Sequence, residues 1–309
     1  KAQSDNGFPL DLLSPYECFY ATPAYINPTL ISDEVKKLVK WHADFIAKEC
    51  MFPDGAINQH PKKRREIWIV PYFAHFACLG LLRAYEVLND KTYLDSAKKW
   101  LLWCKSHMNE DGTVYDYIGG WYPNYTCTYD YDSVDSYSAL FAYCVWEYYR
   151  LTNSKEFLLE LLPYLYRSYN ILKELFQPDG LTFAKPTFKI KYLMDNSEVF
   201  IGLIAYAKIF HEVGEEKKAQ EVLKLAEKNL EGIKMMYSEK LKLFVSEVNM
   251  IGDKMERFEM WYPEGLAQML LLHYVAKPSS KKNEEYFMRV YKMSSNLKSP
   301  PTDRSADQY

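Results

Sequence analysis

The chain has 309 residues, 48% of them hydrophobic, and a net charge of −3. It can therefore bury a large core, and we predict one domain, because no composition shift divides the sequence. A nucleic-acid partner is disfavoured because phosphate binding needs concentrated Lys and Arg, and no apolar run reaches the ~18 residues of a membrane span. The one basic run, at 62–65, is predicted to be a solvated loop leading into an inner helix.

A pattern of about 60 residues recurs along the chain, the scale at which one supersecondary unit is copied. Each copy has an amphipathic helix, a turn with a short extended segment, and a helix that is apolar nearly all round. The turns fall at Asp54-Gly55, Asp111-Gly112, Asp179-Gly180 and 238–240. We predict that each copy is one helical hairpin.

The two helices of each copy have different surfaces. The first keeps apolar residues at helical spacing, as from Val35 to Ile46, and fills the rest with charges. The second is almost uncharged, so neighbours must cover every side. These inner helices are predicted at 67–82, 136–149, 199–210 and 266–275. The predicted fold is an all-α (α/α) hairpin toroid.

Both ends of the chain depart from the pattern. Residues 1–33 are predicted to be an irregular segment, an amphipathic helix is expected from about Glu284 to Leu297, and residues 298–309 are predicted to be a disordered tail. This gives four helix pairs and half of a fifth. Three explanations stay open: the first segment contributes to the ring, the toroid is incomplete, or the sequence stops short of closing it.

The cysteines and histidines give no metal-binding pattern. The six cysteines are widely spaced without a CxxC motif, which is typical of buried thiols in a reducing compartment, and the six histidines are scattered. We therefore predict no metal, no cofactor and a cytoplasmic location, although a cleaved signal peptide would leave no trace.

Hairpins arranged in a ring place every outer-to-inner loop at one end, and these loops are the long ones. They are rich in aromatic rings, which suit the faces of sugars. The alternative is that these rings simply cap the core. The predicted substrate-binding residues are Trp68, Tyr72, Trp121, Tyr122, Tyr192, Trp261 and Tyr262, together with Asp130.

Acids occur in the same loops, just before the inner helices. The predicted catalytic candidates are Asp132, Asp135, Asp195, Glu198 and Glu264. Each also has a structural explanation, because Asp is a favoured N-cap, Asp195 with Glu198 fits a capping box, and Glu264 suits a first turn. The crowding of Asp130, Asp132 and Asp135 favours chemistry, since like charges raise the pKa of one another.

These features resemble the six-hairpin glycosidase superfamily. The stretch from Asp130 to Asp135, followed by Tyr137, is similar to the Asp-x-Asp element of its inverting endoglucanases and xylanases. Those enzymes carry a general acid in a Ser-Glu-Gly-type turn before an early inner helix, and the similar turn here is the later 263–265. The resemblance implies a hydrolase of oligo- or polysaccharides that uses two carboxyls about 6.5 to 9.5 Å apart.

Two other classes of function stay open. A terpenoid-type enzyme could hold Mg²⁺ on Asp132 and Asp135, although no basic pair in the sequence stands beside them to hold a diphosphate. A carbohydrate-binding or scaffold toroid could keep the aromatic groove without catalysis. Release of reducing ends from oligosaccharides separates an enzyme from a binding module.

Overall fold

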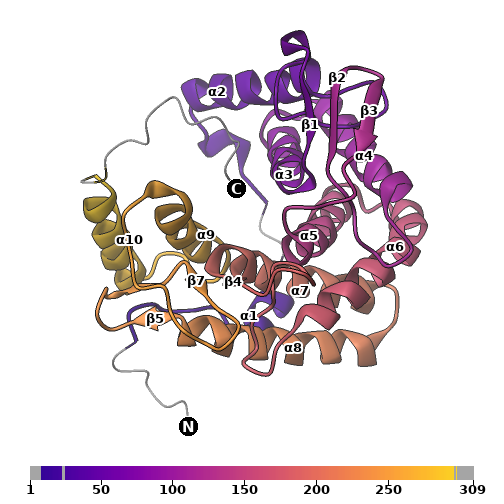
Figure 1. The fold of residues 1–309 in the computed structure, drawn as a ribbon. Coiled ribbons are helices and arrows are strands. Elements are labelled where there is room, and N and C mark those ends of the chain that lie inside the picture. Colours follow the sequence, from indigo (N-terminus) through magenta and orange to yellow (C-terminus); the bar gives the residue numbers. More distant parts are fainter. Residues whose placement is uncertain (1–7, 23–24, 296, 298–309) are drawn as a thin grey trace.

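The recurring pattern folds into outer and inner helices that alternate along an open ring (Figure 1). The computed structural model describes residues 8–22, 25–295 and 297. The outer helices are α2 (Asp33–Asp44), α4 (Lys91–His107), α6 (Lys155–Leu175), α8 (Glu216–Met235) and α10 (Lys281–Ser294). The inner helices are α3 (Pro71–Leu88), α5 (Val134–Thr152), α7 (Leu193–Glu212) and α9 (Leu266–Tyr274). The predicted (α/α) hairpin toroid is confirmed.

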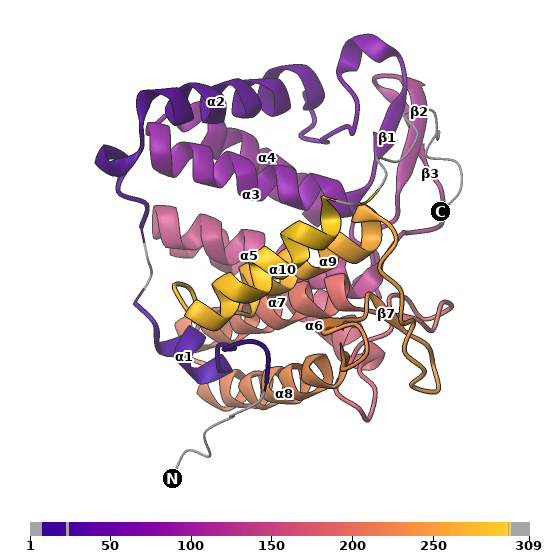
Figure 2. The same ribbon diagram turned by 90° about the vertical axis from the view of Figure 1, so that its left-hand side faces the viewer.

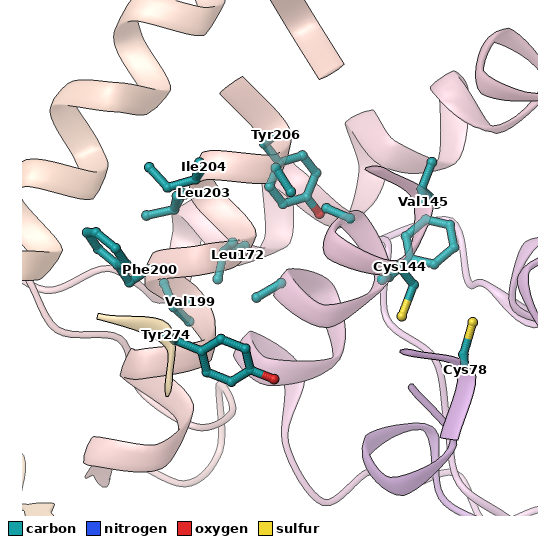
Figure 3. Packing of buried hydrophobic residues seen from close by; sticks show 14 of the residues in the cluster. Cys78, Cys144, Val145, Leu172, Val199, Phe200, Leu203, Ile204, Tyr206 and Tyr274 are labelled. Carbon is teal, nitrogen blue, oxygen red and sulfur yellow. The ribbon is translucent and has the colours of Figure 1, made fainter. Parts of the chain in front are cut away.

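The inner helices form the core, as their lack of charge predicts. Figure 3 shows Val199, Phe200 and Leu203 of α7 among side chains of the neighbouring helices, including Cys144 of α5. The backbones of α5 and α7 approach closely at Gly202, where an added Cβ would lie 2.5 Å from the Cβ of Ala139. This close packing brings the N-terminal ends of the two helices, and the acids on them, together.

The Asp-Gly turns confirm that the repeat is structural. Gly112 has a φ of +89°, and an added Cβ would lie 2.3 Å from the carbonyl oxygen of Arg167 in the next outer helix. Asp111 accepts a hydrogen bond from the backbone N–H of Thr113. Gly55 and Gly180 repeat the same backbone conformation and the same contact with α4 and α8. Only glycine fits this turn, because it needs both a positive φ and the space.

The first inner helix begins later than predicted. Residues Ile67–Ile69 form strand β1, which pairs antiparallel with β2 (Tyr117–Trp121), and β2 pairs with β3 (Asn124–Cys127). The helix starts at Pro71, where the missing N–H costs nothing, and proline also keeps the preceding Val70 extended. The predicted start at Ile67 was wrong because β-branched residues on either side of Trp68 favour pairing with the neighbouring hairpin.

The other outer-to-inner loops carry shorter sheets at the same end of the helices (Figure 2). Strand β4 (Lys191–Tyr192) pairs with β7 (Glu247–Val248), and β5 (Tyr237–Ser238) pairs with β6 (Leu243–Phe244). A π-helical turn, η2 (Phe45–Cys50), ends the first outer helix, and another, η4 (Trp261–Gly265), leads into α9. The long loops therefore gather at one mouth, as their lengths predict.

The segment predicted to be irregular contains the short helix α1 (Pro15–Tyr20) and a 3-10 turn, η1 (Pro28–Leu30). It also pairs with the connection between α9 and α10. The backbone N–H of Leu13 donates to the carbonyl oxygen of Val275, and the backbone N–H of Lys277 donates to the carbonyl oxygen of Asp11. The last helix, α10, ends at Ser294 rather than Leu297. Residues 1–7 and the predicted tail at 298–309 lie outside the described residues.

The cysteines are unpaired thiols. Cys50, Cys78, Cys104 and Cys144 are buried, whereas Cys18 and Cys127 are half-buried. Within the described ranges, no helix is long and apolar enough to cross a membrane.

Candidate active site

A cavity of about 630 Å³ opens at the mouth where the long loops meet. Three of the polar groups that line it come from different elements: Asn58 from the first loop, Asp116 from the loop before β2, and Asp132 from the loop before α5. Trp68 of β1 and Tyr262 of η4 add aromatic surface. A cavity with apolar walls and a few convergent polar groups is the usual form of a small-ligand site.

Asp116 and Asp132 are joined by the hydroxyl of Tyr137. This hydroxyl donates to Oδ1 of Asp116 at 2.7 Å and accepts the backbone N–H of Asp132 at 3.2 Å. Tyr137 is buried in the first turns of α5, so its ring holds the two loop segments in a fixed relation. Two carboxyl groups from different loops therefore face one cavity on a rigid support.

The surroundings raise the pKa of both carboxyl groups, which is the direction that a proton donor needs. Burial raises the pKa of Asp116 to about 7, with Tyr137 opposing the rise and the charges of Asp132 and Asp130 adding to it. Burial also raises the pKa of Asp132, opposed by the nearby Lys185. A carboxyl with a pKa near neutrality can hold a proton and release it during a reaction.

Asp130 differs from the other acids of its loop. Its exposed carboxylate pairs with Lys185 at 3.2 Å and accepts the N–H of Tyr131. Partial burial raises its pKa, but these two contacts outweigh it and leave the pKa below the usual value. The predicted mutual raising of pKa by crowding therefore applies to Asp132 and not to Asp130.

Behind the cavity, the N-terminal ends of α5 and α7 bring three buried acids together. The hydroxyl of Ser133 lies 2.7 Å from Oδ1 of Asp135 and 3.2 Å from Oδ2 of Asp195. Since one hydroxyl donates one proton, a protonated Asp195 that donates to Ser133 satisfies both contacts. The third acid is Glu198, whose Oε1 accepts the hydroxyl of Tyr72 at 2.9 Å. Asp195 retains 4% exposure, whereas the other two acids have none.

All three buried acids resist ionisation. Burial raises the pKa of Asp135 to about 6 and that of Glu198 to about 8. Burial, together with the charges of Asp135, Glu198 and Asp132, raises the pKa of Asp195 well above its usual value. Oε2 of Glu198 and Oγ of Ser136 are buried and form no hydrogen bond of normal geometry among the described residues, although the Ser136 hydroxyl is near enough to lower the pKa of Glu198 somewhat. No cation among the described residues forms an ion pair with any of the three acids.

The predicted capping box of Asp195 and Glu198 was wrong. Helix α7 begins at Leu193, so both acids lie inside its first two turns, and neither side chain caps the helix. Helix α7 follows directly on strand β4, which pairs with β7, and no side chain caps its N-terminus. The two carboxyls are thereby left to face α5 and α3.

Glu264 lies in a different setting. Its Oε1 accepts the Nε of Arg257 at 3.1 Å, and its Oε2 accepts the backbone N–H of Met260 at 2.7 Å and of Glu259 at 3.3 Å. The side chain is 1% exposed and is not among the groups that line the cavity. These contacts are those of an ionised carboxylate that fastens the turn before α9.

The predicted aromatic residues separate into three groups. Trp68 and Tyr262 line the cavity. Tyr72 is buried against Glu198, and Tyr122 stacks on Phe52 with ring centroids 5.0 Å apart. Trp121 and Trp261 are exposed and are absent from the cavity lining. Tyr192 is half-buried, and its burial together with the charges of Glu247 and Asp195 raises its pKa.

Asp116 is the residue that the sequence reasoning missed. The signal for it was an acid between two tyrosines, Tyr115 and Tyr117, inside the aromatic loop. No group of three or more His, Cys, Asp or Glu side chains in the described ranges is arranged to hold a metal ion.

No family model and no curated protein matches this chain. Among solved structures it is similar to the unsaturated glucuronyl hydrolase of Bacillus sp. GL1, described as responsible for the degradation of glycosaminoglycan, with a TM-score of 0.55 and 16% identity. That match covers 68% of this chain and 59% of the hydrolase, so the chain spans about three fifths of that enzyme.

Two further matches widen the chemistry of these neighbours. A sugar epimerase from a ruminal bacterium matches with a TM-score of 0.58 and 13% identity, over 95% of this chain and 81% of the epimerase. The α-1,6-mannanase GH76A of Salegentibacter sp. HEL1_6 matches with a TM-score of 0.51 and 14% identity, over 84% of this chain and 69% of the mannanase. The neighbours are carbohydrate-active enzymes, and the helical ring of this chain matches the (α/α)6 toroids of six-hairpin glycosidase-like proteins over much of its length.

Proposed function

We propose that the protein is a glycoside hydrolase that cleaves an oligo- or polysaccharide in the cavity at the mouth of the ring. The observation that carries the proposal is the pair Asp116 and Asp132, two carboxyls on one sugar-sized cavity, the first with a pKa raised to about 7. The aromatic surfaces of Trp68 and Tyr262 on the same cavity suit the apolar faces of sugar rings.

Each acid has one role in the proposed reaction. Asp116 gives its proton to the leaving glycosidic oxygen, and Asp132 takes a proton from a water molecule as that water adds to the anomeric carbon. Tyr137 positions both groups through its hydroxyl. Positioned proton transfer of this kind contributes about 10² to 10⁴ in rate.

Asp195 is the rival proton donor. Its pKa is raised well above the usual value of a carboxyl group, and the side chain retains 4% exposure. Ser133 connects it to Asp135. We place it behind Asp116 because Asp116 lines the cavity and Asp195 is not among the lining groups.

The proposal is tested by incubating the protein with a panel of neutral and acidic oligosaccharides and measuring reducing ends. We expect release by the wild type and a loss of about 10² to 10⁴ in Asp132→Asn. Asp130→Asn is the matched control, because it removes a neighbouring carboxylate that is exposed and paired with Lys185. Its turnover should stay within a factor of about three.

Two outcomes would overturn the proposal. Interconversion of free sugars without bond cleavage would identify an isomerase or epimerase, as in one of the structural neighbours. Binding of oligosaccharides without any turnover would identify a binding module.

A further inference from the structure

The loop at 59–66 projects from the cavity wall, and the buried side chain of Asn58 holds its two ends together. Nδ2 of Asn58 donates to the carbonyls of His60 and Glu66, both at 2.8 Å, and Oδ1 of Asn58 accepts the N–H of Trp68 at 2.6 Å. Asn58 is 2% exposed. Asn58, His60 and Trp68 all line the cavity, so both ends of the loop are part of its wall.

The tip of this loop carries four consecutive cations, at 62–65, which we call the basic loop. All four are exposed. Arg64 pairs with Glu66 at 3.2 Å and contacts Nδ1 of His60. Lys62, Lys63 and Arg65 form no ion pair with any described residue. One acid against four cations leaves the loop with excess positive charge.

The basic loop lies beside a part of the chain that forms the cavity wall. The loop contains the 3-10 turn η3 (Lys62–Arg64), which packs against η2, the turn that carries the cavity residues Phe45, Ile46 and Cys50. Burial and the charge of Glu49 raise the pKa of Cys50 to about 11, and the ammonium of Lys62 opposes that rise. Lys62 is therefore close enough to influence a group on the cavity wall.

The wall of the cavity thus holds the acids Asp116 and Asp132, and the basic loop leaves and rejoins the same wall between Asn58 and Trp68. A neutral sugar needs no such arrangement, whereas an anionic sugar gains from cations that lie away from the two acids. We propose that the substrate is an anionic saccharide whose carboxylate or sulfate groups are held at the basic loop while the bond to be cleaved lies at the acids. This inference rests on the proposed function.

Matched probes test the charge requirement by calorimetry on the inactive variant Asp132→Asn. The probes are an oligogalacturonate, its methyl ester of the same length, a sulfated glycosaminoglycan oligosaccharide and inorganic pyrophosphate. We expect at least one anionic saccharide to bind about tenfold or more tightly than the neutral ester in 50 mM NaCl. The preference should shrink in 500 mM NaCl, because exposed charges are screened within about 4 Å at that concentration. The sulfated and carboxylated probes distinguish the two sources of charge.

Charge-reversed variants locate the interaction. Lys62→Glu with Lys63→Glu should weaken binding of the anionic saccharide about tenfold or more. Lys37→Glu with Lys91→Glu makes the same change of charge at exposed positions on the outer helices α2 and α4, and should leave binding within a factor of about two. Unchanged melting temperatures would show that both variants are folded.

Three outcomes of the binding series would overturn the inference: the neutral ester binds as tightly as the anionic saccharides, pyrophosphate binds more tightly than any saccharide, or none of the saccharides binds. Equal weakening of binding by both double variants would overturn it as well. Its failure is distinguishable from failure of the proposed function. Selective binding of anionic saccharides without turnover by the wild type would contradict only the hydrolase, and cleavage of neutral oligosaccharides without charge preference would contradict only the anionic substrate.

Discussion

The entries into α7 and α9 place buried acids in opposite electrostatic settings. Asp195 and Glu198, at the start of α7, have hydroxyl neighbours and no ion-paired cation among the described residues. Glu264, before α9, has both oxygens occupied by a guanidinium and two backbone N–H groups. The acids at α7 therefore favour the protonated state, and Glu264 is bound as a carboxylate.

The difference shows that an acid before an inner helix has no fixed role. What decides its role is whether a cation lies within reach of its carboxyl group. Arg257 lies in the loop before η4 and reaches Glu264. Lys185, in the loop before α7, pairs instead with Asp130, and the neighbours of Asp135 are hydroxyl groups.

The largest expected effect separates the cavity acids from the buried acids. Asp116→Asn should lower turnover by about 10² to 10⁴, because the proposed proton donor is lost. Asp195→Asn should lower it by less than about tenfold, because an amide can replace a protonated carboxyl that donates to Ser133. Initial rates for both variants check this. The reverse ranking would make Asp195 the donor and move the reaction to the deeper layer.

The second prediction concerns Glu264. Glu264→Gln should lower the free energy of unfolding by about 1 to 2 kcal/mol while turnover stays within a factor of about three, because the ion pair fastens a turn and its partner Arg257 is partly exposed. Denaturant unfolding and initial rates measure the two effects. Arg257→Gln should destabilise at least as much, since it leaves a buried carboxylate unpaired. Lost turnover at unchanged stability would assign catalysis to the α9 entry.

The third prediction uses pH to test the protonated state of Glu198. Its pKa is about 8 in the folded protein and about 4.5 when unperturbed, so its neutral form stabilises the fold fully below pH 4.5, and this contribution is lost as the pH rises to about 8. Between pH 6 and 9, the Tm of the wild type should therefore fall more than the Tm of Glu198→Gln. The difference should be a few degrees, because each kcal/mol of stability corresponds to about 2 °C in a protein of this size. A wild-type Tm that rises relative to the variant would show an ionised Glu198.

The smallest expected effect concerns Tyr137, which joins the two cavity acids. Its hydroxyl favours the ionised form of Asp116, so Tyr137→Phe should raise the pKa of Asp116 and move the alkaline limb of the rate profile upward by about half to one pH unit. Tyr206→Phe is the control, since it removes another buried tyrosine hydroxyl, one that donates to the carbonyl of Ser138. The control should lose stability without moving the profile, and equal shifts in both variants would remove Tyr137 from the site.

Periodicity alone predicted the architecture. The alternation of half-charged and uncharged helices, with Asp-Gly turns between them, fixes outer and inner positions, because a helix without charged residues must be covered on every side. The same turns placed the long aromatic and acidic loops at one mouth, and Trp68, Asp132 and Tyr262 do line the cavity there.

Only the tertiary structure decided which acids act together and in which protonation state. Asp116 was missed because its importance comes from the hydroxyl of Tyr137 on another element, and no local pattern reports that contact. Glu264 carries the same sequence signal as the other acids, yet Arg257 holds it as a carboxylate. A pKa depends on burial and on charges within a few ångströms, and a residue's distance along the chain does not say which of these neighbours reach it. The sequence thus determines which end of the ring carries the acidic and aromatic loops, and packing determines which carboxyl groups have a raised pKa.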